Sequence, residues 1–257
     1  MLFLLIRQII FKHGVTSGME TQIIEYECDN LTMEGFLAIG ESHLSKQPLV
    51  LVVHDWSGQR AFAQEKAKYF AKQGFVGFAV DLYGKGKRGS DTDNSLNQSL
   101  LNELLQDRNV IIARLQAALD YCLQLAMVDA QKVMAIGFCM GGMGVLDFAR
   151  SGADIHGVIS IHGILGAPQN AVANKINAKV LVLQGHEDKL ANPQQILEFE
   201  TEMTNKQVDW QLHLFGNAAH AFTNPKADDK SAGLLFDPLA NARTWELVRN
   251  FTTEIFE

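Results

Sequence analysis

The stretch "VMAIGFCMGGMGVL" (residues 133–146) changes its character halfway along. Its first half is apolar, as expected of a buried strand, and its second half continues with helical spacing. Between the halves, Gly137 precedes Cys139 and Gly141 follows it, in the order G-x-C-x-G. Glycine allows a tight turn and a close approach of neighbouring backbone. We therefore predict a sharp strand-to-helix turn with a cysteine at its apex.

Strand and helix patterns alternate along the rest of the chain. Two short strands joined at Asp29-Asn30 indicate an antiparallel hairpin over residues 21–40. Further along, continuous apolar runs suit strands that are buried on both faces, and amphipathic runs suit helices. The predicted strands are residues 48–55, 75–84, 132–138, 157–163, 179–185 and 208–215. The predicted helices are residues 61–74, about 100–125, 141–152, 193–204 and 238 to the C-terminus.

This alternation predicts an α/β fold with a mainly parallel central sheet, helices on both of its faces and an N-terminal antiparallel hairpin. In such sheets, functional groups gather at the carboxyl ends of the strands. Reactive residue types do collect there in this sequence. They are His54, Asp55, Asp81, Cys139, Asp188 and His220.

The cysteine turn matches the nucleophile elbow of α/β-hydrolases, G-x-S-x-G, with cysteine in place of serine. The α/β-hydrolase fold is therefore the predicted fold. The helix that begins after Cys139 would stabilise a thiolate at its N-terminus. Taken alone, the G-x-C-x-G pattern also fits an alternative interpretation, a buried structural cysteine beside a tight turn. The strand before the turn and the helix after it favour a nucleophile.

A nucleophile needs a base, and the base needs an acid that orients it. In α/β-hydrolases the acid follows the nucleophile along the chain, and the histidine comes last. Asp188, in "VLVLQGHEDKLANP", is the next strand-end acid, and we prefer it to Glu187 because it lies further into the loop. His220 follows the last predicted strand. The predicted catalytic triad is Cys139, Asp188 and His220.

Acyl transfer also needs donors for the oxyanion that develops on the substrate. The amide of Met140, directly after the nucleophile, is one candidate. The amide of Trp56, in the loop after residues 48–55, is the other. Each such donor contributes about 3 kcal/mol to the stabilisation of the transition state.

Two other histidines are candidates for a role in the site. His162 follows a strand and could line the site, but we expect it to pack or to bond to a nearby carbonyl. His186 stands beside Glu187 and Asp188, which could suggest a metal site. Three adjacent side chains do not easily converge on one ion, so we predict hydrogen bonds within the loop and no metal.

The sequence resembles the dienelactone hydrolase (carboxymethylenebutenolidase) family of α/β-hydrolases. The similar stretches, in family order, are "VVHDWSG", "GFVGFAVDLYGKG", "IGFCMGG", "LQGHEDKL" and "AAHAFTNP". They extend over nearly everything from about residue 21 onward. The resemblance implies a triad of Cys139, His220 and Asp188, and an enzyme that opens an enol lactone carrying a carboxylate.

Two further roles are implied by the resemblance. Asp55 stands where the best-known members have a glutamate that interacts with the resting cysteine, and a loop-stabilising carboxylate is the alternative. Lys85 falls where an arginine holds the substrate carboxylate, and a solvated loop is the plain alternative. The other expected arginine is replaced by Asn224. The bidentate contact that arginine makes with a carboxylate is therefore missing.

Composition excludes several classes of protein. The chain has 257 residues, a net charge of −7 and a pI near 5.6, so no broad basic face for nucleic acid is expected. Its three cysteines are widely spaced and odd in number, which argues against a disulfide framework and favours a reducing compartment. The sequence contains no C-x-x-C pair, so a structural zinc site is not expected.

Residues 1–18 do not fit the pattern that follows. Their apolar run is too short to span a bilayer, and its charges lie inside and after the run, unlike those of a secretory signal. We expect an extension outside the fold, with a weak membrane-surface anchor as the competing interpretation. Residues 19–257 are expected to form one α/β-hydrolase domain.

These observations predict a cytoplasmic hydrolase of small-molecule esters or lactones, of the carboxylic ester hydrolase class, that uses no cofactor. We expect no nucleic-acid or membrane partner and a monomer or homodimer. A general carboxylester or thioester hydrolase without lactone preference is the first alternative. A non-enzymatic thiol-based sensor on the same fold is the second.

Overall fold

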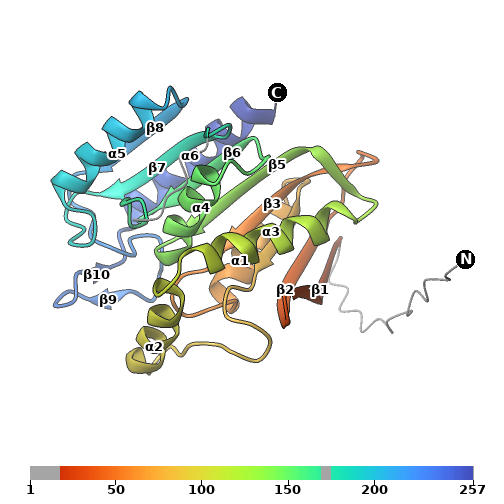
Figure 1. Ribbon diagram of the computed structural model, residues 1–257, viewed down its shortest axis with the longest axis horizontal. Helices are drawn as coiled ribbons and strands as arrows, with labels where there is room; N and C mark the ends of the chain where they lie inside the picture. Colours follow the sequence, from red (N-terminus) through yellow and green to blue (C-terminus); the bar gives the residue numbers. More distant parts are fainter. Residues whose placement is uncertain (1–17, 169–174, 257) are drawn as a thin grey trace, which may run out of the picture.

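The computed structural model of the protein describes residues 18–168 and 175–256. An eight-stranded sheet extends through this part in the order β1-β2-β4-β3-β5-β6-β7-β8, with β1 and β8 at its opposite edges (Figure 1). The strands are β1 Met19–Cys28, β2 Leu31–Gly40, β3 Gln47–Val53, β4 Val76–Val80, β5 Val128–Phe138, β6 Gly157–Ile161, β7 Lys179–Gly185 and β8 Trp210–Phe215. Strands β3 to β8 pair parallel with one another.

The N-terminal hairpin is antiparallel, as predicted. Strands β1 and β2 pair from Met19 with Gly40 to Cys28 with Leu31, and Asp29 takes a positive φ of 53° in the turn between them. Strand β2 then pairs antiparallel with β4, which joins the hairpin to the parallel sheet. The sheet is therefore mainly parallel with one antiparallel end. Gly18 is the last residue of the segment 1–18 expected to lie outside the fold, and its carbonyl accepts from the Glu41 amide at 3.1 Å. Residues 1–17 lie outside the described residues, and the domain limits stay a prediction.

Helices cover both faces of the sheet because alternate strand residues point to opposite sides. Leu49, Leu51 and Val53 of β3 pack in one core with residues of α3 (Asn109–Leu123), α4 (Met140–Arg150) and α5 (Pro193–Asn205). Val50 and Val52 pack in the other core, with residues of α1 (Ala61–Ala71) and α6 (Pro238–Phe256). Within residues 18–168 and 175–256, no helix is long and apolar enough to cross a bilayer.

The single long helix predicted over about residues 100–125 is wrong. The chain forms two helices there, α2 (Asn94–Leu105) and α3, with a short break between them. Asp107 lies in this break and accepts a hydrogen bond from the Asn109 amide at 3.0 Å. Aspartate favours such local backbone bonds over the helix interior. The apolar spacing continues through both helices and therefore conceals the break.

Two very short strands follow the last strand of the main sheet. Strands β9 (Asp228–Asp229) and β10 (Leu234–Leu235) pair antiparallel in a separate hairpin. His220 bonds to this hairpin, because its amide donates to the Gly233 carbonyl and its carbonyl accepts from the Leu235 amide, both at 3.0 Å. A pair of two-residue strands has too little periodicity to be predicted, but here it fixes the backbone of a site residue.

Candidate active site

Cys139 lies in the predicted turn between β5 and α4. Its φ of 54° and ψ of −116° are unusual for a residue with a side chain. The glycines beside it are required by close backbone contacts. A Cβ atom on Gly137 would lie 2.0 Å from the Gly141 carbonyl oxygen, and one on Gly141 would lie 2.3 Å from the Val53 carbonyl oxygen. The turn can therefore approach β3 and the start of α4 only with glycine at both positions.

Cys139, His220 and Asp188 meet at the carboxyl edge of the sheet. The Cys139 sulfur lies 3.0 Å from Nε2 of His220, and Nδ1 of His220 lies 2.8 Å from Oδ2 of Asp188. His220 and Asp188 are buried, whereas Cys139 is partly exposed. The three groups come from separate loops that follow β5, β7 and β8. The arrangement can hold a thiolate beside an imidazolium that a carboxylate orients.

The pKa of His220 reflects two opposed effects. Burial alone would lower it, because burial disfavours the charged ring. The Cys139 thiolate and the hydrogen bonds to Asp188 and Cys139 outweigh burial, and raise the pKa of His220 from 6.5 to about 10. The His220 ring is therefore charged at neutral pH, and a charged ring stabilises a thiolate beside it.

Asp188 is held by two residues besides His220. Its Oδ1 accepts from the Leu190 amide at 2.8 Å, and its Oδ2 accepts from Nε2 of Gln184 at 2.6 Å. The carboxylate therefore has little freedom to rotate away from His220. Glu187, the alternative acid, is exposed.

The two amides expected to bind the oxyanion belong to two segments that Tyr83 contacts. The Tyr83 hydroxyl donates to the Trp56 carbonyl at 2.9 Å and lies 3.7 Å from the Met140 sulfur. Within the described part of the chain, neither the Trp56 amide nor the Met140 amide donates a hydrogen bond. Met140 is the first residue of α4, where amides have no partner inside the helix. Both donors are therefore free for a ligand.

Asp55 binds its own loop. Its Oδ1 accepts from the Ser57 amide at 2.8 Å and from the Ser57 hydroxyl at 2.6 Å. These are the two hydrogen bonds of its carboxylate in the described structure. They match the loop-stabilising alternative, and a role toward the resting cysteine stays a prediction.

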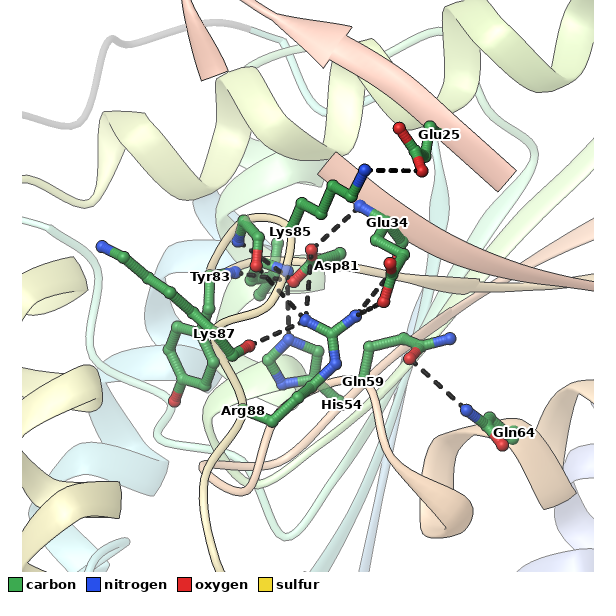
Figure 2. A network of polar contacts seen from close by, with 12 residues as sticks. Glu25, Glu34, His54, Gln59, Gln64, Asp81, Tyr83, Lys85, Lys87 and Arg88 are labelled. Carbon is green, nitrogen blue, oxygen red and sulfur yellow. Dashed lines mark hydrogen bonds and ion pairs between the residues drawn. The ribbon is translucent and has the colours of Figure 1, made fainter. Parts of the chain in front are cut away.

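Lys85 extends toward β1, as Figure 2 shows. Its Nζ lies 2.7 Å from a carboxylate oxygen of Glu25, and both side chains are about half exposed. The lysine is therefore engaged by an acidic residue of the hairpin. Its predicted contact with a substrate carboxylate stays a prediction.

A buried carboxylate shapes the loop that follows β4. Asp81 accepts hydrogen bonds from the amides of Glu34, Tyr83 and Gly84, and Arg88 lies 3.4 Å from its Oδ2 (Figure 2). The loop backbone thus turns around Asp81. This turn places Tyr83 against Trp56.

As expected from the sequence, His162 bonds to a nearby carbonyl, since its amide donates to the Leu183 carbonyl at 2.9 Å. Its ring bonds to two further groups. Its Nδ1 accepts from the Cys139 amide at 3.1 Å, and its Nε2 lies 2.9 Å from the Thr223 hydroxyl. Packing, the other part of that expectation, is confirmed, since the ring lies 5.1 Å from the Phe222 ring.

Sequence reasoning missed three residues that contact the site: Tyr83, Gln184 and Thr223. Gln184 could have been found, because it is a polar residue in the otherwise apolar run of β7. Tyr83 directly follows a strand end, but its hydroxyl partner lies in a loop distant in sequence. Among residues 18–168 and 175–256, no three His, Cys, Asp or Glu side chains could hold a metal ion.

Comparison with known proteins supports the same fold. The family model described as "Dienelactone hydrolase family" matches residues 33–256. The solved structure m3DLH is 35% identical, with a TM-score of 0.87, and the match covers 94% of this chain and 100% of that chain. A crystal structure described as a dienelactone hydrolase-like promiscuous phosphotriesterase from metagenomic libraries is 32% identical, with a TM-score of 0.88 and the same coverage.

A relative from Aquifex aeolicus carries the provisional name carboxymethylenebutenolidase. It is 28% identical over 236 residues, and the match covers 90% of this chain and 96% of the relative. Together with the parallel sheet and the N-terminal hairpin, these matches confirm the predicted α/β-hydrolase fold.

Proposed function

The chain belongs to the dienelactone hydrolase family, whose members are hydrolases of esters or lactones, and we propose that it uses Cys139 as its nucleophile. In this proposal His220 is the proton carrier and Asp188 orients it. The observation that carries the proposal is the unbroken contact series from the Cys139 sulfur through His220 to Asp188, at 3.0 and 2.8 Å.

The resting site is a thiolate beside an imidazolium. Each charge stabilises the other in a mostly buried setting, which agrees with the raised pKa of His220. The thiolate attacks the carbonyl carbon of the substrate, and the carbonyl oxygen becomes an oxyanion. The amides of Met140 and Trp56 donate to that oxyanion. No proton needs to leave the thiol in this step.

Collapse of the tetrahedral intermediate breaks the bond to the leaving oxygen. The His220 imidazolium gives its proton to that oxygen, and Cys139 remains as a thioester. The alcohol so formed leaves when the substrate is an ester and stays attached to the acyl chain when it is a lactone. The thioester carries no charge, and His220 thereby loses the thiolate that raised its pKa. The neutral ring then serves as a base.

Water completes the cycle. Nε2 of His220 takes a proton from water, and the hydroxide attacks the thioester carbonyl. The second tetrahedral intermediate expels the Cys139 thiolate and releases the carboxylic acid. The charged histidine and the thiolate are then restored, so protons and charges balance over one turnover.

The side chains at the two positions where the family resemblance implies contacts with a substrate carboxylate favour uncharged substrates within this class. Lys85 is paired with Glu25, and Asn224 stands where the family resemblance implies an arginine. One hydrogen bond to a charged group contributes about 1.5–3 kcal/mol. A substrate carboxylate would lack that contribution here. We therefore propose small neutral esters or lactones rather than a carboxylated lactone.

A matched pair of enol lactones, with and without a carboxylate, tests this substrate class. We expect the uncharged lactone and 4-nitrophenyl acetate to be hydrolysed with kcat/KM equal to or above that of the charged lactone. A preference of about tenfold or more for the charged lactone would contradict the proposal. Failure to hydrolyse any ester or lactone, with Cys139 still reactive toward iodoacetamide, would favour the thiol-based sensor.

Phosphotriester hydrolysis is a second candidate activity. It is favoured by the 32% identity to the structure described as a promiscuous phosphotriesterase. The thiolate would attack phosphorus and displace an aryloxide, and water activated by His220 would then cleave the phosphorus–sulfur bond. The amides of Met140 and Trp56 would bind the phosphoryl oxygen. Adding diethyl 4-nitrophenyl phosphate to the substrate panel checks this activity.

The cytoplasm is the compartment that we propose for the enzyme. A partly exposed thiolate is readily oxidised, and a reducing compartment protects it. The other two cysteines, Cys28 and Cys122, are buried and free. We also propose that residues 19–257 form a single catalytic domain.

A further inference from the structure

His162 connects the two loops that carry Cys139 and His220. It follows β6 directly and is 2% exposed. On one side, its Nδ1 accepts from the Cys139 amide. On the other, its Nε2 bonds to Thr223, which lies three residues after His220 and is 1% exposed. No step of the proposed mechanism uses this second buried imidazole.

The hydrogen bond from the Cys139 amide favours one state of the His162 ring. A backbone amide is a donor only, so Nδ1 must be the unprotonated nitrogen. Nε2 therefore carries the hydrogen and donates it to the Thr223 hydroxyl oxygen. Burial and the nearby charge of His220 hold the pKa of His162 well below its usual value, so the ring remains neutral. A charged ring would direct an N–H at the amide of Cys139.

The His162 backbone also indicates a constrained position. Its φ of 39° lies in the left-handed region that a residue with a side chain seldom occupies. The ring lies 5.2 Å from the His220 ring, nearly edge to face. Any displacement of the His162 ring would therefore reach both the elbow and the His220 ring.

We propose that His162 and Thr223 are positioning residues that hold the Cys139 sulfur and the His220 ring in contact. The connection extends from the Cys139 amide through the His162 ring to the Thr223 hydroxyl. The inference rests on the proposed function, because it assigns these residues to the Cys139–His220 pair. It concerns neither substrate contact nor proton transfer.

Loss of the Thr223 hydroxyl should disturb both ends of this connection. Without it, the buried Nε2–H of His162 has no acceptor, which is costly. The ring then shifts, or places its hydrogen on Nδ1, where it opposes the Cys139 amide. The Cys139 amide retains its bond to the Ile161 carbonyl at 3.0 Å, so the elbow itself should persist.

Thr223→Val is the decisive variant, because valine keeps the shape of threonine and removes its hydroxyl. We expect kcat for 4-nitrophenyl acetate to fall about tenfold with KM changed less than about threefold, since small misplacements of reacting groups are costly. Alkylation of Cys139 by iodoacetamide at pH 6 should slow by a similar factor. Thr223→Ser, which restores the hydroxyl, should recover most of both rates.

Thr244→Val is the matched control. Thr244 is a fully buried threonine of α6 whose hydroxyl has no hydrogen-bond partner in the described structure. The proposal is overturned if Thr223→Val matches Thr244→Val in kcat and in alkylation rate. Should Thr223→Val fail to fold, His162→Phe is the substitute variant. It keeps an aromatic ring at this position and loses both hydrogen bonds, so the same losses in kcat and alkylation rate are expected.

The alkylation rate separates this proposal from the proposed function. Retained hydrolysis in Cys139→Ala would overturn the function without affecting the alkylation comparison. Equal alkylation in Thr223→Val and Thr244→Val would overturn the positioning role even if Cys139 proves to be the nucleophile.

Discussion

Replacing Cys139 with alanine should lower kcat/KM for 4-nitrophenyl acetate by about 10³-fold or more. The thiolate forms the covalent bond to the acyl group. Its removal leaves the Met140 and Trp56 amides, which still stabilise an oxyanion but provide no nucleophile. The loss should appear in steady-state kinetics as a fall in kcat.

The structure provides a control for this substitution. Cys28→Ala removes a buried thiol from β1, on the hairpin at the edge of the sheet, and should leave kcat/KM nearly unchanged. Both variants should keep the far-UV circular dichroism of the wild type. Turnover in Cys139→Ala close to that of Cys28→Ala would refute the nucleophile assignment.

Replacing His220 with asparagine should slow the reaction of Cys139 with iodoacetamide. In the wild type the thiolate raises the pKa of His220 from 6.5 to about 10, so the ring stays charged up to about pH 10 and stabilises the thiolate. We therefore expect iodoacetamide to alkylate Cys139 readily at pH 6. Without the imidazolium beside its sulfur, Cys139 should be alkylated more slowly at pH 6 than in the wild type.

The same variant should lose about 10³-fold in kcat, because no imidazole remains to give a proton to the leaving alcohol or to take one from water. His186→Asn, which alters an exposed histidine two residues before Asp188, is a suitable control. An unchanged rate of Cys139 alkylation at pH 6 in His220→Asn would show that the imidazolium does not stabilise the thiolate.

Much of the fold could be predicted because its signals are local. The turn at Asp29-Asn30 lies between two alternating strands, and the glycines around Cys139 mark a backbone that only glycine permits. The order of Cys139, Asp188 and His220 along the chain, combined with parallel strands, was enough to predict that they lie close together. The distances of 3.0 and 2.8 Å agree with that expectation.

Other features depend on contacts that no local pattern carries. The break between α2 and α3 arises from local hydrogen bonds at Asp107, while the apolar spacing continues through it. The pairing of Lys85 with Glu25 joins residues sixty positions apart, so a lysine in a family position says nothing about its partner. The contacts of His162 depend on the tautomer of its ring, which only the surrounding donors fix.

The covalent intermediate is the most direct test of the proposed chemistry. Wild-type protein mixed with 4-nitrophenyl acetate, quenched in acid within the first turnovers and digested, should carry the acetyl group on the peptide that contains Cys139. The His220→Asn variant, which lacks the base for deacylation, should retain any acetyl group it gains for longer. An acetyl group on a different residue, with Cys139 unmodified while product forms, would contradict the account.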